Sequence, residues 1–167
     1  MHDEALVAER IRSAWRDLRR AGSTTEVRAL LYAPDAPLDV AQADALDLVV
    51  SNAPIRMRDI AALLRVDPST ATRAIDRLHQ QHLVVRAPDP LDARVVLVAP
   101  SARGAELHAR VRRRANELLV DTLRGFDPED RERLASLMER LVAAADDRRP
   151  ALAGAATASV DRGAESP

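Results

Sequence analysis

The sequence predicts a mainly α-helical fold that carries one small β-hairpin. Apolar residues recur at helical spacing along most of the chain, and proline or glycine interrupts that spacing at intervals. β-Branched residues concentrate instead in two short runs, 83–86 and 94–98. The chain has 167 residues, of which 47% are hydrophobic and only 2% aromatic. It is therefore the size of one domain with terminal extensions, and its core must be aliphatic.

Residues 1–37 are predicted to form an N-terminal helical region. Apolar side chains recur over 5–20 with the spacing of an amphipathic helix. Residues 23–26 have the spacing of a capping box, which predicts a second, short helix that ends near Tyr32. The proline-containing segment 33–37 is predicted to be a connector.

The central region, residues 38–100, begins with a further predicted helix. Asp39 can cap this helix, and Gln42 stands three residues later, as in a capping box. Proline disfavours helical geometry in the residue before it, so the helix is expected to end before Pro54. Its buried stripe is expected at Val40, Ala43, Leu46 and Val50.

Two short helices, 57–64 and 68–80, are predicted after a very short strand at 55–57. Asp67 followed by Pro68 marks the start of the second helix, with an N-cap and a proline at the first helical position. The positions expected to face inward are Ile60, Ala61, Leu64, Ala71, Ile75 and Leu78. The opposite face of the second helix then presents Ser69, Thr70, Thr72, Arg73, Asp76 and Arg77.

The two β-branched runs flank residues 87–92, which have the composition of a turn, so the runs are predicted to form a hairpin. The order of helix, short turn, helix and hairpin predicts a winged helix-turn-helix. In that fold the second helix enters the major groove of DNA, and the hairpin is the wing.

The C-terminal region, residues 101–147, is predicted to contain two helices. Ser101 can cap the first, which ends near Arg124, and the Asp-Pro pair at 127–128 opens the second. Residues 148–167 combine Ala, Gly, Ser and Pro with scattered charge. This segment carries too little apolar surface to offset the entropy of ordering, which predicts a disordered tail.

Several classes of function are excluded by what the sequence lacks. There is no cysteine, which excludes disulfides and thiolate metal sites within this chain. Motifs for a nucleophile elbow, a phosphate loop or a zinc protease are absent, so we expect no enzyme, no catalytic residue and no cofactor. His79 and His82 near Asp76 could be imagined as a metal site, but polar surface explains them and no metal is expected.

The sequence also predicts where the protein acts. No apolar run is long enough to span a membrane, and the N-terminus lacks the basic start and apolar run of a signal peptide. We therefore expect a cytoplasmic protein with no membrane partner.

Net charge gives no argument for nucleic-acid binding, because 25 basic residues face 26 acidic ones for a formal net charge of -1. The argument must come from the distribution of the charges. All of the basic residues are arginine, whose planar guanidinium suits phosphate oxygens and the edge of guanine.

The exposed face of the 68–80 helix offers a role for each polar side chain. Ser69 and Thr70 lie at the helix N-terminus, where hydroxyls, free N–H groups and the helix dipole favour a phosphate. Arg73, one turn further along and next to Thr72, is expected to bind guanine O6 and N7. Arg77 can reach a base or a phosphate. The alternative is a solvated, ion-paired helix face without a DNA role.

In the predicted wing, Arg94 begins the return strand just beyond the tip and is expected to reach the minor groove. Asp92, two residues earlier, is expected to hold that guanidinium in place, and the alternative is a local turn pair without a DNA role. Asp89 is expected to shape the turn.

Residues 38–107 resemble the MarR family of bacterial regulators. The sequence Asp-Pro-Ser-Thr-Ala-Thr-Arg-Ala-Ile-Asp-Arg-Leu at 67–78 matches the recognition helix of that family. Residues 104–107 match the start of the long helix that follows its wing. The wing pattern itself matches at Arg86, Asp89 and 92–94.

The resemblance implies a triangular homodimer in which the first helix and the last two interleave between subunits. A twofold dimer of this kind reads a near-palindromic DNA site with half-sites about one helical turn apart. The resemblance also implies a repressor that a small aromatic or anionic effector releases from DNA. Trp15, Tyr32 and Met57 are candidates for lining the effector cleft, or alternatively core residues.

The alternative function is a winged helix used for protein–protein contact, which the nearly neutral net charge permits. A basic patch confined to the recognition helix and the wing would favour DNA binding instead.

The chain departs from the family pattern at several positions. Arg65 and His82 replace usual glycines, so a left-handed backbone there would be strained by about 1–2 kcal/mol. Arg56 replaces a usual hydroxyl N-cap, Ala93 a frequent wing cation, and Pro100 a usual leucine. The wing tip is therefore expected to bind DNA more weakly than in better-matched relatives.

Overall fold

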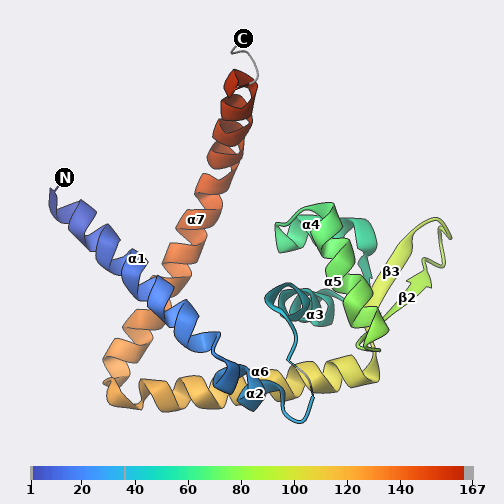
Figure 1. Ribbon diagram of the computed structural model, residues 1–167, viewed down its shortest axis with the longest axis horizontal. Helices are drawn as coiled ribbons and strands as arrows, with labels where there is room; N and C mark the ends of the chain where they lie inside the picture. Colours follow the sequence, from blue (N-terminus) through green and yellow to red (C-terminus); the bar gives the residue numbers. More distant parts are fainter. Residues whose placement is uncertain (1, 36, 164–167) are drawn as a thin grey trace. The chain divides into compact units, whose positions relative to one another are not determined.

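The structure is a computed structural model that describes residues 2–35 and 37–163 (Figure 1). The chain forms two units, Met1–Leu118 and Leu119–Pro167. In chain order the elements are α1 (His2–Gly22), α2 (Thr25–Tyr32), α3 (Val40–Asn52), β1 (Ile55–Arg56), α4 (Met57–Leu64), α5 (Pro68–Gln80), β2 (Val84–Pro88), β3 (Val96–Pro100), α6 (Ala102–Thr122), the 3-10 turn η1 (Leu123–Gly125) and α7 (Pro128–Gly163). The predicted fold class, mainly helical with a β-wing, is confirmed.

A three-stranded antiparallel sheet, in the order β1-β3-β2, lies beside the α4–α5 pair (Figure 1). Ile55 pairs with Val98, and Val85 pairs with Ala99. The hairpin strands begin later than predicted because hydrogen bonds close the intervening turn. The N–H of Asp89 donates to the carbonyl of Val95 over 2.8 Å, which leaves Arg94 in the turn rather than at the start of the strand.

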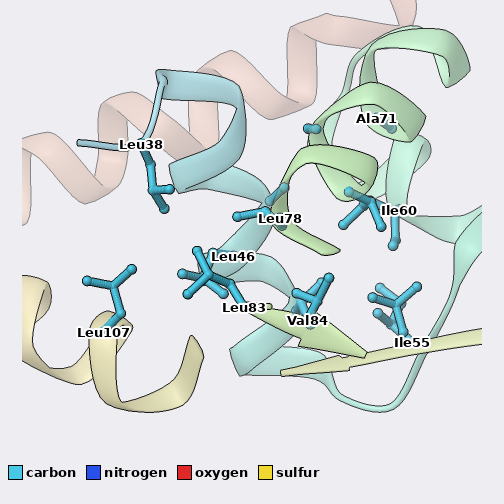
Figure 2. Close-up of a cluster of buried hydrophobic side chains, with 14 of the residues drawn as sticks. Leu38, Leu46, Ile55, Ile60, Ala71, Leu78, Leu83, Val84 and Leu107 are labelled. Atoms are coloured by element: carbon cyan, nitrogen blue, oxygen red, sulfur yellow. The ribbon is translucent and has the colours of Figure 1, made fainter. Parts of the chain in front are cut away.

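One apolar core holds the central elements together. Figure 2 shows it between α3, α4, α5, the sheet and the start of α6. The largest fully buried side chains are Val49, Ile60, Ile75, Leu78, Leu83, Val84 and Val98. Because α5 packs its apolar side into this core, its polar side is left on the surface.

The predicted buried stripe of α3 is confirmed in part, because Leu46 is buried and Ala43 and Val50 pack half-buried against the core, whereas Val40 does not. Val40 is 70% exposed, and the buried residues are Gln42, Ala45, Leu46 and Val49. The reason is the capping box. Asp39 Oδ1 accepts from the Gln42 N–H at 2.8 Å, and Gln42 Oε1 accepts from the Asp39 N–H at 3.0 Å. These bonds hold the Gln42 side chain against the first turn of α3. Gln42 is therefore buried, although the pattern of apolar residues predicts its neighbours as the buried positions.

Two residues adopt the left-handed backbone conformation where the sequence departs from glycine. Arg65 has φ 61° and His82 has φ 58°. Arg65 ends α4, and its N–H donates to the carbonyls of Ala61 and Ala62. His82 lies between α5 and β2. These two turns set the angles at which α5 leaves α4 and the wing leaves α5, at a cost of about 1–2 kcal/mol each.

Helix α6 begins against the wing. Ser101 caps it as predicted, because Ser101 Oγ accepts from the Gly104 N–H at 3.0 Å while donating to the His82 carbonyl at 2.6 Å. Gly104 is buried, with the Leu83 backbone beside it. The start of α6 is thus fixed to the segment between α5 and β2.

In the second unit, α7 continues to Gly163, beyond the predicted start of a disordered tail at residue 148. Alanine has the highest helix propensity, and the segment 151–158 is rich in it, which accounts for the continued helix. Residues 164–167 lie outside the described residues. Among the described helices, none combines the length and the apolar composition of a membrane span.

Candidate nucleic-acid interface

The outward face of α5 carries the polar residues that the helical spacing predicts there. Ser69, Thr72, Arg73 and Arg77 are exposed, and Thr70 is half-buried. The opposite face is buried and consists of Ala71, Ala74, Ile75 and Leu78. Helical periodicity therefore predicted which side of α5 is available to a ligand.

Two side chains of this face fold back onto the first turn of α5. Thr72 Oγ1 donates to the Pro68 carbonyl at 2.8 Å, and Arg73 Nε donates to the Ser69 carbonyl at 3.2 Å. The Nη1 and Nη2 atoms of Arg73 have no partner within the described part of the chain. The guanidinium is thus anchored at one nitrogen while its terminal fork stays available for an acceptor pair.

Arg77 makes a different contact. Its Nη1 lies 2.8 Å from Oδ2 of Asp39, the N-cap of α3. This geometry matches the ion-paired alternative for this residue. Both side chains are exposed, and such surface pairs contribute only about 0.2–1 kcal/mol. A phosphate can therefore compete with Asp39 for Arg77.

Asp76 turns away from the arginines of its own helix and binds the wing. Its Oδ1 lies 2.6 Å from Nη2 of Arg86 in β2, and the side chains are 43% and 30% exposed. Helical spacing alone places Asp76 on one face with Arg73 and Arg77. Linear spacing carries no signal for a pair between helix and strand, and only the match of Arg86 to the wing pattern pointed to that residue.

The wing turn is built by its two aspartates. Asp89 Oδ1 accepts from the Leu91 N–H at 2.9 Å, as expected for a residue that shapes the turn. Asp92 Oδ1 accepts from the Arg94 N–H at 3.0 Å. This corrects the expectation that Asp92 holds the Arg94 guanidinium, because Asp92 fixes the main chain instead. The Arg94 side chain is exposed and has no partner among the described residues.

A groove of about 680 Å³ separates the start of α4 and the start of α5 from the wing. Its lining residues are Arg56, Met57, Arg58, Ala61, Pro68, Ala71, Thr72, Arg86, Asp92, Arg94, Val95 and Val96. Thr72, Asp92 and Arg94 are predicted site residues, whereas Arg56 and Arg58 are not. Arg56 carried one signal, an arginine at the N-cap position of a helix, where a hydroxyl is usual, and Arg58 carried none.

A second cavity, of about 270 Å³, lies between α2, α3 and α6. Its lining includes Tyr32, Leu38, Asp44, His108 and Arg112. Burial raises the pKa of the Tyr32 hydroxyl. Burial also raises the pKa of the Asp44 carboxyl, and the nearby negative charge of Asp47 adds to this.

The three residues proposed for an effector cleft are not brought together. Tyr32 lines the second cavity, whereas Met57 lines the groove beside the wing. Trp15 is 56% exposed on α1. Within the described residues, no three potential ligands gather as a metal site would require.

Comparison with known proteins identifies a family, a relative and two solved structures. The family model described as MarR family matches residues 36–95. An uncharacterized HTH-type transcriptional regulator of Mycobacterium bovis is 33% identical over 114 residues, covering 68% of this chain and 80% of the relative.

Solved structures share the fold. The crystal structure of Streptococcus pneumoniae FabT in complex with DNA has a TM-score of 0.74 at 16% identity, covering 84% of this chain and 98% of that chain. The PcaV transcriptional regulator from Streptomyces coelicolor, in complex with its natural ligand, has a TM-score of 0.58 at 22% identity, covering 79% of this chain and 91% of that chain.

Proposed function

The chain belongs to the MarR family of DNA-binding transcriptional regulators, and we propose that it is a homodimeric repressor of a near-palindromic operator. The observation that carries the proposal is the outward face of α5. That face is polar, and among the residues that the structure describes neither its arginine fork nor the guanidinium that the wing presents beside it has a partner. This is what reading a major groove and gripping the neighbouring minor groove requires.

Each residue of the site has a proposed role. Ser69 and Thr70 hold a phosphate at the start of α5. Arg73 reads a guanine, with Thr72 beside it on the groove wall. Arg94 enters the minor groove, and Arg77 exchanges Asp39 for a phosphate. Asp92 supports the wing turn.

The proposed dimer is supported by the apolar residues that the terminal helices expose. In α1 these are Leu6, Val7, Ile11, Trp15 and Leu18. In α7 they are Leu134, Leu137, Met138, Leu141 and Val142. Stripes of this size are rarely left in water, and a symmetric partner offers an equivalent stripe. We therefore propose 1–37 and 101–147 as dimerisation regions around a DNA-binding region at 38–100.

We also propose that a small aromatic or anionic effector regulates the repressor. The cavity between α2, α3 and α6 supports this, because Tyr32 offers an aromatic ring while His108 and Arg112 offer cationic or hydrogen-bonding partners. The cavity joins the helix that precedes the DNA-binding region to the one that follows it. An occupant there could shift the spacing of the two recognition helices in a dimer.

The protein–protein alternative is less well supported. The net charge of -1 permits it, but arginine side chains gather at the groove between the recognition helix and the wing. We propose that the repressor acts in the cytoplasm, because chromosomal DNA lies there. We also propose that it is not an enzyme.

Selection of bound sequences from random duplex DNA tests the proposal. The full-length protein should enrich a near-palindrome with half-sites about one helical turn apart. The absence of enrichment at low salt would overturn DNA recognition and favour the protein-contact function.

A further inference from the structure

We propose that the groove between α4, α5 and the wing holds one phosphodiester strand, and that Arg56 and Arg58 bind its phosphates. The inference rests on the proposed DNA binding and adds two residues and a path for the backbone. Within residues 2–35 and 37–163, four guanidinium groups line the groove, from Arg56, Arg58, Arg86 and Arg94, against the single carboxylate of Asp92. This excess of positive charge fits a polyanion.

The partners of these arginines show which charges are available. Arg86 is committed to Asp76. Arg58 Nε lies 3.4 Å from Asp59, but both side chains are largely exposed, so a phosphate can replace that contact. Arg56 and Arg94 have no partner among the residues that the structure describes. The carboxylates of Asp76 and Asp59 offset the charges of Arg86 and Arg58. Asp92 offsets one more, so one of the four positive charges at the groove remains.

The position of Arg56 points to the same use. Arg56 is the N-cap of α4, and its side chain makes no capping hydrogen bond. An arginine has no acceptor, so it cannot cap a helix as serine or aspartate does. The first turn of α4 therefore lacks a side-chain cap, and a cation lies at the groove in place of a capping hydroxyl.

The geometry of B-form DNA indicates which part of the duplex lies in the groove. One phosphodiester strand always separates a major groove from the adjacent minor groove. If α5 lies in the major groove and the Arg94 turn lies in the minor groove, that strand must pass between them. The space between α5 and the wing is this groove, whose walls include Thr72 on α5 and Arg94 on the wing.

The test measures how the dissociation constant of the full-length protein depends on NaCl concentration, with the selected operator and with an unrelated duplex. Each phosphate contact contributes about 0.9 to the slope of log affinity against log salt. Because the proposed dimer carries each substitution twice, Arg56→Ala and Arg58→Ala should each reduce the slope by about 1.8. At about 0.1 M salt each should weaken binding to both duplexes by roughly 60-fold. Arg56→Lys should keep the slope.

Two further variants control for other effects. Arg56→Ser restores a capping hydroxyl, so it should fold at least as well as the parent yet lose the same slope. Arg113→Ala removes an exposed cation from α6, away from the groove, and should leave the slope unchanged.

The outcomes separate the two proposals. Unchanged slopes for Arg56→Ala and Arg58→Ala, in a protein that still prefers its operator, would overturn the phosphate channel and leave DNA recognition intact. A parent protein that binds neither duplex at low salt would overturn the proposed function and the channel with it.

Discussion

The carboxylate of Asp76 lies 2.6 Å from the guanidinium of Arg86, and this ion pair ties the recognition helix α5 to strand β2 of the wing. The two elements contact different grooves in the proposed complex, so their separation must match the DNA. The pair joins them directly across the edge of the sheet. Asp76 is thus a positioning residue for the wing, although it carries the wrong charge for DNA.

Asp76→Asn tests this positioning role. Removing a carboxylate from a DNA-facing surface should strengthen binding by charge alone. We expect the opposite, a severalfold weaker complex, because the wing loses its fixed distance from α5. The stability loss should stay within about 1 kcal/mol, since the pair is partly exposed.

A double-mutant cycle supplies the control for Asp76→Asn. Operator affinity should fall no further in Asp76→Asn/Arg86→Gln than in either single variant. Additive losses would show that Arg86 contacts DNA independently of Asp76 and would contradict the positioning role.

Substitutions of Arg73 and Arg94 are expected to change DNA binding in different ways. Arg73→Ala should cost about 1–3 kcal/mol of discrimination at the guanine it reads, and so relax the selected motif. Arg94→Ala should weaken binding while leaving the preferred major-groove bases nearly unchanged. Binding measured against a set of single-base operator variants distinguishes the two. Identical effects of both substitutions on every sequence would refute the assigned roles.

Gly104→Ala should destabilise the DNA-binding unit. A Cβ on Gly104 would lie 1.9 Å from the Leu83 carbonyl oxygen and 2.8 Å from its carbon. Both are backbone atoms, so no side-chain rotation relieves the clash, and α6 must move away from the segment between α5 and β2. Overpacking of this kind costs about 1–3 kcal/mol or more, measurable by chemical denaturation.

Gly22→Ala is the matched control for Gly104→Ala. A Cβ on Gly22 meets nothing within 4 Å, and alanine raises helix propensity at the end of α1. This substitution should therefore leave stability unchanged or slightly higher. Equal losses from both substitutions would contradict the steric argument.

The helix-turn-helix could be predicted from local sequence. The observed bounds of α4 and α5, Met57–Leu64 and Pro68–Gln80, are those that the apolar spacing and the Asp-Pro start signal predicted. The left-handed turns at Arg65 and His82 were anticipated from the family's glycines. These features depend on residues within a few positions of one another, which is why sequence specifies them.

The remaining features depend on contacts between distant residues. The Asp76–Arg86 and Asp39–Arg77 pairs join separate elements, so no spacing rule reveals them. Arg56 became a candidate only when the fold placed it across a groove from the wing. The sequence also could not show that Asp92 would bind a main-chain N–H rather than a guanidinium, because both groups lie equally near along the chain.

Asp44 should make stability depend on pH. Burial and the charge of Asp47 raise its pKa in the folded protein above the ordinary aspartate value. Between the ordinary and the raised value the folded state therefore binds more protons than the unfolded state, and stability falls as pH rises through that interval. Asp44→Asn removes the charge, so at neutral pH the variant should be more stable than the parent, by less than about 1 kcal/mol because the carboxyl is partly solvated.

Thermal unfolding of parent and Asp44→Asn between about pH 3 and pH 7 checks the sign. The advantage of the variant should shrink as pH falls, because the parent carboxyl then becomes neutral as well. Glu106→Gln, on the exposed surface of α6, controls for the loss of one negative charge. If the stability advantage of Asp44→Asn grew toward low pH, the folded protein would stabilise the charged form of Asp44. That result would contradict the raised pKa of this carboxyl.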